Sequence, residues 1–449
     1  MNSRARTSDG NRVHPGAAAV QLDEVLAQLH HAGIQRALVR EPSRDGQDRL
    51  EADLLVSPGD LSATEQILAG HGFRRRPGWG RRPHRFHLLP TANDDGTIDW
   101  LKVDVVTDLC FGSLHELVSG TAARCLAARP DPTSKRLLPA DELMGLLLHG
   151  LLDAPQLRTD QRDALRALAP TAGQPGPLAR RCLPSGPDGI TWDELLDAIA
   201  RSDWPQIARL RPVLRNHLRA GRQISVEVRR LSSFVGRRGA KALTAVAAPG
   251  PVVALIGPDG TGKTTLAAAL AESSGLPSRV LYGGTYRSGT QGSTVPGLTT
   301  ARLIGRLLGT RAQLSWHRAR GRLVVLDRHP VQARPTADDH LGARARFRRR
   351  VVAATLPKPD LLLALDVPTA ELHRRRPEHT VERLGRDRNQ TLALAQSTPG
   401  AMVVDATSAP DMLRDETIRI VWERAVPAAP GRGRRTPGPF DRRAPDENR

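Results

Sequence analysis

The stretch Val252-Val-Ala-Leu-Ile-Gly257-Pro-Asp-Gly-Thr-Gly-Lys263-Thr264 decides the fold of the C-terminal part of the chain. Its first five residues are apolar and predict a buried strand, and residues 266–270 predict the helix that follows the loop. The residues between them fit the pattern G-x-x-x-x-G-K-[ST], the Walker A or phosphate-binding loop. In that motif, backbone N–H groups and the positive end of the helix dipole surround a polyanion.

The loop predicts that the chain binds ATP together with Mg²⁺. We expect Lys263 to reach the β- and γ-phosphates and the Thr264 hydroxyl to hold Mg²⁺. Lysine is rare in this arginine-rich chain, so its use at this position supports the motif. The alternative is a glycine-rich turn without a function. The residues expected around the nucleotide are Gly257, Asp259, Gly260, Thr261, Gly262, Lys263, Thr264 and Thr265.

The composition limits the class of protein. The 449 residues are enough for two or three domains, and 39% of them are apolar. Aromatic residues make up only 3%, so Leu, Val and Ala must fill the cores. No apolar run reaches the roughly 18 residues of a membrane span, and the polar N-terminus does not resemble a secretory signal. The cysteines, at 110, 125 and 182, show neither metal-ligand nor disulfide spacing, so we expect a reducing cytoplasm.

The formal net charge of +19 invites a nucleic-acid interpretation. Nearly all the basic residues are Arg, however, and several lie in apparent tails, as a general compositional bias would produce. We therefore expect neither nucleic acid nor a membrane as a partner. The expected partner is a small phosphorylated acceptor, and a homodimer is left open.

The pattern of apolar residues divides the chain into five parts and predicts an α/β fold class. The parts are a disordered tail (1–17), an α+β region (18–128), a helical region (129–248), an α/β region with a parallel sheet (249–425) and a disordered basic tail (426–449). In the first half, helices are predicted over 21–31, 61–68, 140–152, 160–168, 192–199 and 204–218. Strands are predicted there over 37–39, 50–56, 86–89 and 100–106. A Pro/Gly cluster over 171–189 is expected to interrupt the helices.

In the α/β region, strands are predicted over 252–256, 279–282, 323–326, 361–365 and 402–404. Ligands of such sheets lie beyond the carboxyl ends of the strands, where Asp327 and Arg328 follow a strand. Asp327 is expected to hold Mg²⁺ and Arg328 an acceptor phosphate, the alternative being an ion pair that caps the strand. Residues 371–388 contain six Arg and predict a lid over the triphosphate, or else a solvated basic helix.

These motifs, together with Pro359-Asp360 before a strand that ends at Asp366-Val-Pro368, make residues 249–425 resemble the thymidylate kinase family. The resemblance implies transfer of the ATP γ-phosphoryl group to a nucleoside monophosphate or a similar phosphorylated acceptor. It implies that Asp259 contacts the acceptor sugar and Arg328 its phosphate. The lid residues Arg374, Arg375 and Arg376 are then the candidate catalytic cations. Residues 281–287 lack the Phe of that family, and His329 replaces its Tyr, so the acceptor stays open.

A second acidic pattern lies in the α+β region. Glu51 and Asp53 alternate along one predicted strand and Asp104 lies on another, so their carboxylates are expected to share one face. The pattern resembles the nucleotidyltransferase superfamily, which implies a site for two divalent metals. The Gly-Ser element of that family is missing, and Val39-Arg40-Glu41-Pro42 stands in its place. Three alternatives remain: a second catalytic site (a nucleotidyltransferase or bifunctional enzyme), a degenerate copy, or a regulatory protein that binds ATP without catalysis.

Overall fold

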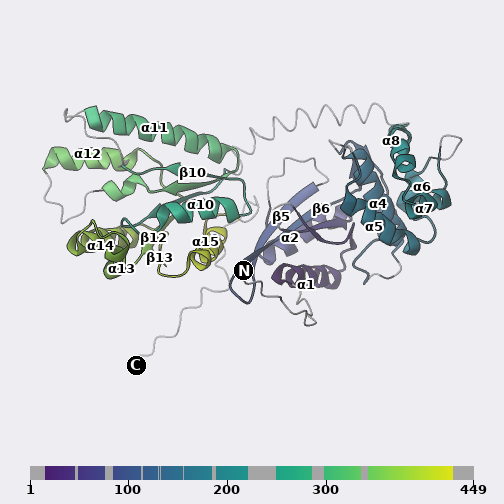
Figure 1. The fold of residues 1–449 in the computed structure, drawn as a ribbon, viewed down its shortest axis with the longest axis horizontal. Coiled ribbons are helices and arrows are strands. Elements are labelled where there is room, and N and C mark those ends of the chain that lie inside the picture. Colours follow the sequence, from purple (N-terminus) through teal and green to yellow (C-terminus); the bar gives the residue numbers. More distant parts are fainter. Residues whose placement is uncertain are drawn as a thin grey trace, which may run out of the picture.

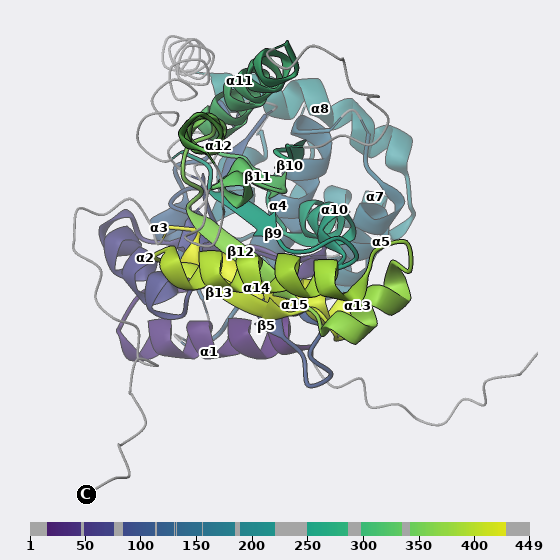
Figure 2. The same ribbon diagram turned by 90° about the vertical axis from the view of Figure 1, so that its left-hand side faces the viewer.

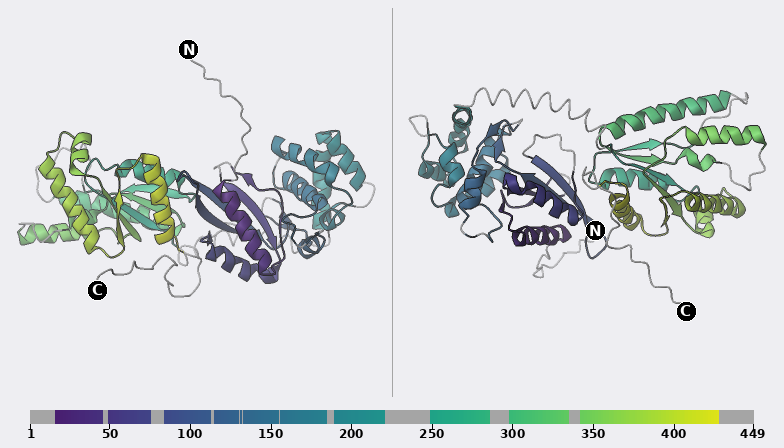
Figure 3. Two further views of the ribbon diagram at one scale, coloured as in Figure 1. Left: turned by 90° about the horizontal axis from the view of Figure 1, so that it is seen from below. Right: turned by 180° about the vertical axis from the view of Figure 1, so that it is seen from behind.

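The computed structural model describes residues 16–45, 49–75, 84–112, 115–129, 131, 133–154, 156–184, 189–220, 249–285, 298–334 and 342–427. The two predicted tails lie almost wholly outside these residues, and so do residues 221–248 of the predicted helical region. The predicted α/β class is confirmed, with a mixed sheet in the N-terminal part and a parallel sheet in the C-terminal part. Figure 1 shows three groups of elements in a row, and Figure 3 shows the same row from below and from behind.

The N-terminal group is a mixed sheet covered on one face by two helices. The helices are α1 (Ala17–His31) and α2 (Leu61–Gly70), and their apolar side chains share a core with alternate residues of the sheet. Strand β3 runs parallel to β6, whereas the other pairings are antiparallel. The order across the sheet is β1 (Arg36–Leu38), β3 (Leu50–Val56), β6 (Ile98–Val106), β5 (His84–Ala92) and β4 (Arg74–Arg75), with β2 (Ser43–Arg44) paired to β3.

The second face of this sheet touches both other groups. At one end, Leu55 and Val106 belong to the core of the helical group. At the other end, Leu88 and Trp100 belong to the core of the C-terminal group. Between these apolar ends lies a charged section that includes the predicted carboxylates. The sheet therefore connects the two other groups through opposite ends of one face.

The helical group follows a short hairpin, β7 (Cys110–Phe111) with β8 (Leu117–Val118). Its helices are α3 (Ala122–Ala127), α4 (Pro139–Leu152), α5 (Thr159–Leu168), α6 (Pro177–Cys182), α7 (Trp192–Ala200) and α8 (Trp204–Arg219). Helix α6 lies inside the cluster predicted to interrupt the helices, so that prediction was wrong there. The buried Asp141 carboxylate accepts the Leu178 N–H at 2.8 Å, and this distant cap stabilises the first turn of α6. No helix among the described residues combines the length and apolar character needed to cross a membrane.

The C-terminal group is a five-stranded parallel sheet with helices on both faces. Across it run β10 (Ser278–Tyr282), β11 (Leu323–Asp327), β9 (Val252–Ile256), β12 (Leu361–Asp366) and β13 (Ala401–Asp405). Helices α10 (Lys263–Ser273) and α15 (Pro410–Arg424) pack on one face, and α11 (Leu298–Ala319) and α12 (Ala343–Ala354) on the other (Figure 2). Helices α13 (Thr369–Arg375) and α14 (Val381–Ser397) follow β12. The central strand β9 is fully buried and delivers the glycine-rich loop to the carboxyl edge.

The N-terminal sheet meets the C-terminal group at the end of α10. The Trp100 ring packs edge-on against Trp422, with ring centroids 5.3 Å apart, and its indole N–H donates to the Ser273 carbonyl at 3.1 Å. Arg49 donates to the carbonyl of Gly275 at 3.3 Å. Gly275 has φ +60°, and a Cβ there would lie 2.9 Å from the Trp100 ring, so the contact requires glycine.

Candidate functional site

The predicted strand, loop and helix are present around the glycine-rich stretch. Strand β9 ends at Ile256, and α10 begins at Lys263. Gly260 and Gly262 have φ +93° and +85°, values that side chains strongly disfavour, so these two glycines allow the chain to curl. The Thr261 hydroxyl donates to the Pro258 carbonyl at 3.0 Å and closes the turn. The loop therefore has the backbone conformation that its sequence predicts.

Lys263 is a buried cation whose described hydrogen-bond partners are neutral oxygens. Its side chain belongs to a residue that is only 4% exposed. The ammonium group donates to the Pro258 carbonyl at 2.5 Å and to the Thr261 hydroxyl at 3.3 Å. Burial, with a further contribution from the nearby Arg328 cation, lowers the pKa of Lys263 to about 8. A polyanion in the loop would favour the charged form of this group.

A hydroxyl and a carboxylate meet beside this lysine. The Thr264 hydroxyl donates to Asp327 Oδ2 at 2.8 Å, although the two residues lie 63 positions apart in the chain. Asp327 ends β11, next to β9, and is 5% exposed. Its second oxygen, Oδ1, is buried without a hydrogen-bond partner. A hydroxyl and a carboxylate with a free oxygen are ligands of the kind Mg²⁺ takes, so these two residues fit such an ion.

The next residue, Arg328, has an unusual backbone conformation. Its φ is +71°, a region that non-glycine residues enter at a cost of about 1–3 kcal/mol. This conformation lets its guanidinium group meet Asp259 of the glycine-rich loop, with Nη2 to Oδ1 at 2.6 Å. Burial acts to raise the pKa of Asp259, but the Arg328 hydrogen bond and charge outweigh it, and the pKa is lowered. The two residues predicted to contact the acceptor are therefore paired with each other.

His329 has a structural place that sequence reasoning missed. It is buried, its Nδ1 accepts the Val331 N–H at 3.1 Å, and its Nε2 lies 3.2 Å from the Pro357 carbonyl. Burial lowers the pKa of His329 to about 4, so the ring is neutral at physiological pH. The ring starts the short helical turn Pro330–Ala333 that leads away from the site.

The three candidate lid arginines differ in what they contact. Arg375 donates to the Gly260 carbonyl at 3.3 Å. Arg376 also adjoins Gly260, because a Cβ built there would lie 3.1 Å from Arg376 Cγ. All three also pair with nearby glutamates, Arg374 and Arg375 with Glu371 at 2.6 and 2.8 Å and Arg376 with Glu378 at 3.4 Å, and the Arg374 side chain is the most exposed at 78%. The structure thus brings two of the three arginines to the loop.

Two further arginines lie near the site: Arg388, from the predicted lid stretch, and Arg306, which was not predicted. Arg388 of α14 forms a bidentate pair with Asp366, at 2.6 and 2.8 Å, and ties the lid region to the end of β12. Arg306 of α11 lies over the Tyr282 ring, 5.5 Å from its centroid, and donates to the Gly284 carbonyl. No local sequence signal distinguishes Arg306 from the many other arginines, and the pairing of Arg388 with Asp366 was not expected from the lid stretch. Residues 286 and 287 of the stretch compared with the family lie outside the described residues.

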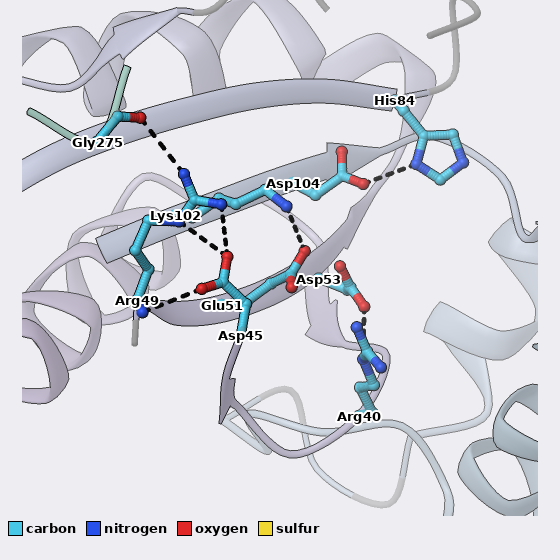
Figure 4. A network of polar contacts seen from close by, with 9 residues as sticks. All are labelled: Arg40, Asp45, Arg49, Glu51, Asp53, His84, Lys102, Asp104 and Gly275. Carbon is cyan, nitrogen blue, oxygen red and sulfur yellow. Dashed lines mark hydrogen bonds and ion pairs between the residues drawn. The ribbon is translucent and has the colours of Figure 1, made fainter. Parts of the chain in front are cut away.

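The predicted carboxylates of the N-terminal sheet do come together (Figure 4). Asp53 lies directly opposite Asp104 on neighbouring strands, and Glu51 lies opposite Lys102. Each carboxylate already has a basic partner: Lys102 is 2.5 Å from Glu51, Arg40 is 2.7 Å from Asp53, and His84 is 2.7 Å from Asp104. Within the described part of the chain, no three His, Cys, Asp or Glu side chains are placed to hold a metal ion.

Comparison with known proteins adds a weak structural likeness. No family model matches the sequence, and no curated protein matches it. A solved structure of deoxyadenosine kinase from M. mycoides, with the products dCMP and a flexible dCDP bound, is similar with a TM-score of 0.29 and 13% identity. The match covers 38% of this chain and 98% of that one. The likeness is too slight to carry an argument, so the proposals below rest on the geometry of this chain.

Proposed function

We propose that the protein is an ATP-dependent phosphotransferase of the thymidylate kinase-like type. It transfers the γ-phosphoryl group of ATP to the phosphate of a nucleoside monophosphate or a similar small phosphorylated acceptor. One observation carries the proposal: the buried Lys263 ammonium group, bonded to neutral oxygens, lies at a glycine-rich loop beside the Thr264–Asp327 pair. A cation in that setting, next to ligands suited to Mg²⁺, matches what a triphosphate requires.

The roles of the residues follow from their positions. Lys263 and the backbone N–H groups of the loop hold the β- and γ-phosphates, while Thr264 and Asp327 hold Mg²⁺. The bound ion supplies neutralisation of the charge on the phosphate oxygens. Arg375 and Arg376, which adjoin Gly260, are placed to offset charge on the transferred group. Arg374 is assigned no contact, because its described partner is Glu371 and not the loop.

The acceptor is assigned to the side of the loop where Asp259 and Arg328 lie. An oxygen of the acceptor phosphate attacks the γ-phosphorus, and the bond to the oxygen that bridges the β- and γ-phosphorus breaks, so ADP leaves. Arg328 holds the acceptor phosphate, which then competes with Asp259 for the guanidinium group. Once Arg328 binds that phosphate, the Asp259 carboxylate is free to accept a hydrogen bond from a hydroxyl group of the acceptor.

The test is transfer of label from γ-labelled ATP to a panel of nucleoside monophosphates and phosphosugars. Lys263→Ala serves as the inactive control, and Lys358→Ala as the matched control at an exposed lysine. Labelled nucleoside diphosphate formed by the wild type and by Lys358→Ala, but not by Lys263→Ala, supports the proposal. Mg²⁺-dependent ATP binding without transfer to any acceptor favours the regulatory alternative. Absence of ATP and GTP binding in calorimetry refutes both.

A further inference from the structure

The charged section of the N-terminal sheet places acidic and basic side chains together on one face. On β3, Glu51 and Asp53 point to the same face, and on β6, Lys102 and Asp104 lie beside them in register. Figure 4 shows these side chains together, with Arg40 and His84 reaching the outer carboxylates. The three basic side chains come from different places: Arg40 follows β1, Lys102 lies on β6, and His84 begins β5.

The register itself creates a need for counter-ions. Asp53 and Asp104 are directly opposite each other on neighbouring strands, and like charges in that position destabilise a sheet. The Asp104 side chain is only 8% exposed and that of Asp53 is 20% exposed, so solvent screens them little. Arg40 and His84, each at 2.7 Å, remove this repulsion within the protein. The ion pairs therefore offset the repulsion that the pairing of β3 with β6 creates between Asp53 and Asp104.

The same pairs conflict with the two divalent metals that the resemblance implies. A pair of metals requires carboxylate oxygens that face the ions and are shared between them. Asp53 Oδ2 instead accepts from Arg40 Nε, and Glu51 Oε1 accepts from Lys102 Nζ. A metal at either carboxylate would face a fixed positive charge at hydrogen-bond distance. One buried oxygen, Asp104 Oδ1, lacks a partner, but a single oxygen does not satisfy an ion that takes about six ligands.

We propose that the carboxylates of the N-terminal sheet form a metal-independent site, in which Arg40 and Lys102 act as permanent counter-ions, and His84 as a hydrogen-bond partner, where divalent ions would otherwise bind. The site's role is to hold β3 and β6 in register between the end that contacts the C-terminal group and the end that contacts the helical group. Trp100, two residues before Lys102, packs on Trp422, and Arg49, two residues before Glu51, contacts Gly275. This assignment is independent of the proposed kinase activity.

The test is a titration of the full chain with Mn²⁺ in the absence of nucleotide. Electron paramagnetic resonance measures the bound ion. Asp53→Asn should leave the binding curve of the wild type unchanged. Arg40→Ala, which frees Asp53 Oδ2 by changing a partly exposed residue after β1, should add a Mn²⁺ site or tighten binding by about tenfold, a change of about 1.4 kcal/mol. The double variant Arg40→Ala/Asp53→Asn should lose that gain.

Two outcomes would overturn the inference. One is a wild-type Mn²⁺ site that Asp53→Asn abolishes, because the carboxylates would then hold metal despite their counter-ions. The other is no gain of Mn²⁺ binding in Arg40→Ala when its circular dichroism spectrum and thermal midpoint show a folded chain. If Arg40→Ala does not fold, Arg40→Gln, which retains a polar side chain but removes the charge, is measured instead with the same expectations. Neither result depends on phosphoryl transfer.

Discussion

Two lysines of this chain illustrate how differently a cation can be held. Lys263, at the glycine-rich loop, is 4% exposed and bonds a carbonyl and a hydroxyl oxygen. Lys102, on the N-terminal sheet, pairs with the Glu51 carboxylate at 2.5 Å and lies 5.0 Å from the centre of the Phe86 ring. Lys102 has its counter-ion within the protein. Lys263 forms no such pair among the described residues, so its charge remains available to an anionic ligand.

The difference has an energetic basis. Burial of a cation without an opposite charge is unfavourable, and the protein responds by lowering the pKa of that group. The unfavourable term is relieved when an anion binds, so it contributes to affinity. An internal ion pair is already satisfied, and its disruption leaves the partner unpaired. The first arrangement suits a binding site, whereas the second suits a structural site.

The largest expected effect separates these two lysines. Lys263→Ala should lower turnover by about 10²–10³-fold while the chain remains folded, because an electrostatic donor to the transferring group is lost. Lys102→Ala should leave turnover unchanged but lower the free energy of unfolding by about 1–3 kcal/mol, since Glu51 loses its partner. Steady-state kinetics and urea denaturation of both variants measure these effects. Comparable loss of turnover in Lys102→Ala would contradict the comparison.

The second prediction uses the pKa of Lys263, which burial lowers to about 8 in the protein without ligand. Bound ATP favours the ammonium form and raises this pKa, so affinity is full below pH 8 and decreases as pH rises through it. Calorimetry should show Mg-ATP affinity about tenfold weaker at about pH 9 than at about pH 7. In Lys263→Met, the remaining weak affinity should be independent of pH over that range. An equally steep dependence in that variant would assign the titration to another group.

The third prediction concerns the connection between the two regions. Gly275→Ala should lower the free energy of unfolding by about 1–3 kcal/mol, because the new Cβ meets the Trp100 ring at 2.9 Å in a left-handed backbone conformation. Gly305→Ala is the matched control: it lies inside α11, where a Cβ meets nothing within 4 Å. That variant should be more stable by about 0.5–1 kcal/mol. Chemical denaturation distinguishes the two, and equal stability of both variants would argue against close contact at Gly275.

The elements that sequence reasoning located best have clear local boundaries. Strands β9 and β3 match the predicted ranges, since each is a run of apolar or alternating residues with sharp ends. Helices were expected between the strands of the C-terminal region, but no ranges were predicted for α11, α12 or α15. Helix α12 is dominated by Arg, and Val352 is its only fully buried residue among those described, so it lacks an apolar stripe. Helix α11 contains two glycines, which weaken the helical signal.

The two candidate sites differ in the same way. One consists mainly of residues that are close in the sequence, and the other of residues that only strand pairing brings together. The loop around Lys263 is one continuous motif, so its residues could be predicted together. The Thr264–Asp327 contact was also accessible, because parallel strands bring their carboxyl ends to one edge. The partners of the N-terminal carboxylates could not be predicted from the sequence. Arg40, His84 and Lys102 lie 13, 20 and 51 positions from their acids, and only the strand order and register bring them together.

Helix α10 gives the molecule an optical reporter of its own state. Its first turn carries Lys263 and Thr264, and its last residue, Ser273, lies about 15 Å further along the helix axis, where its carbonyl accepts the indole N–H of Trp100. Indole fluorescence responds to hydrogen bonding at the ring nitrogen. We expect a ligand that shifts this helix to change the emission of Trp100, an effect that a Trp100→Phe variant separates from the other tryptophans.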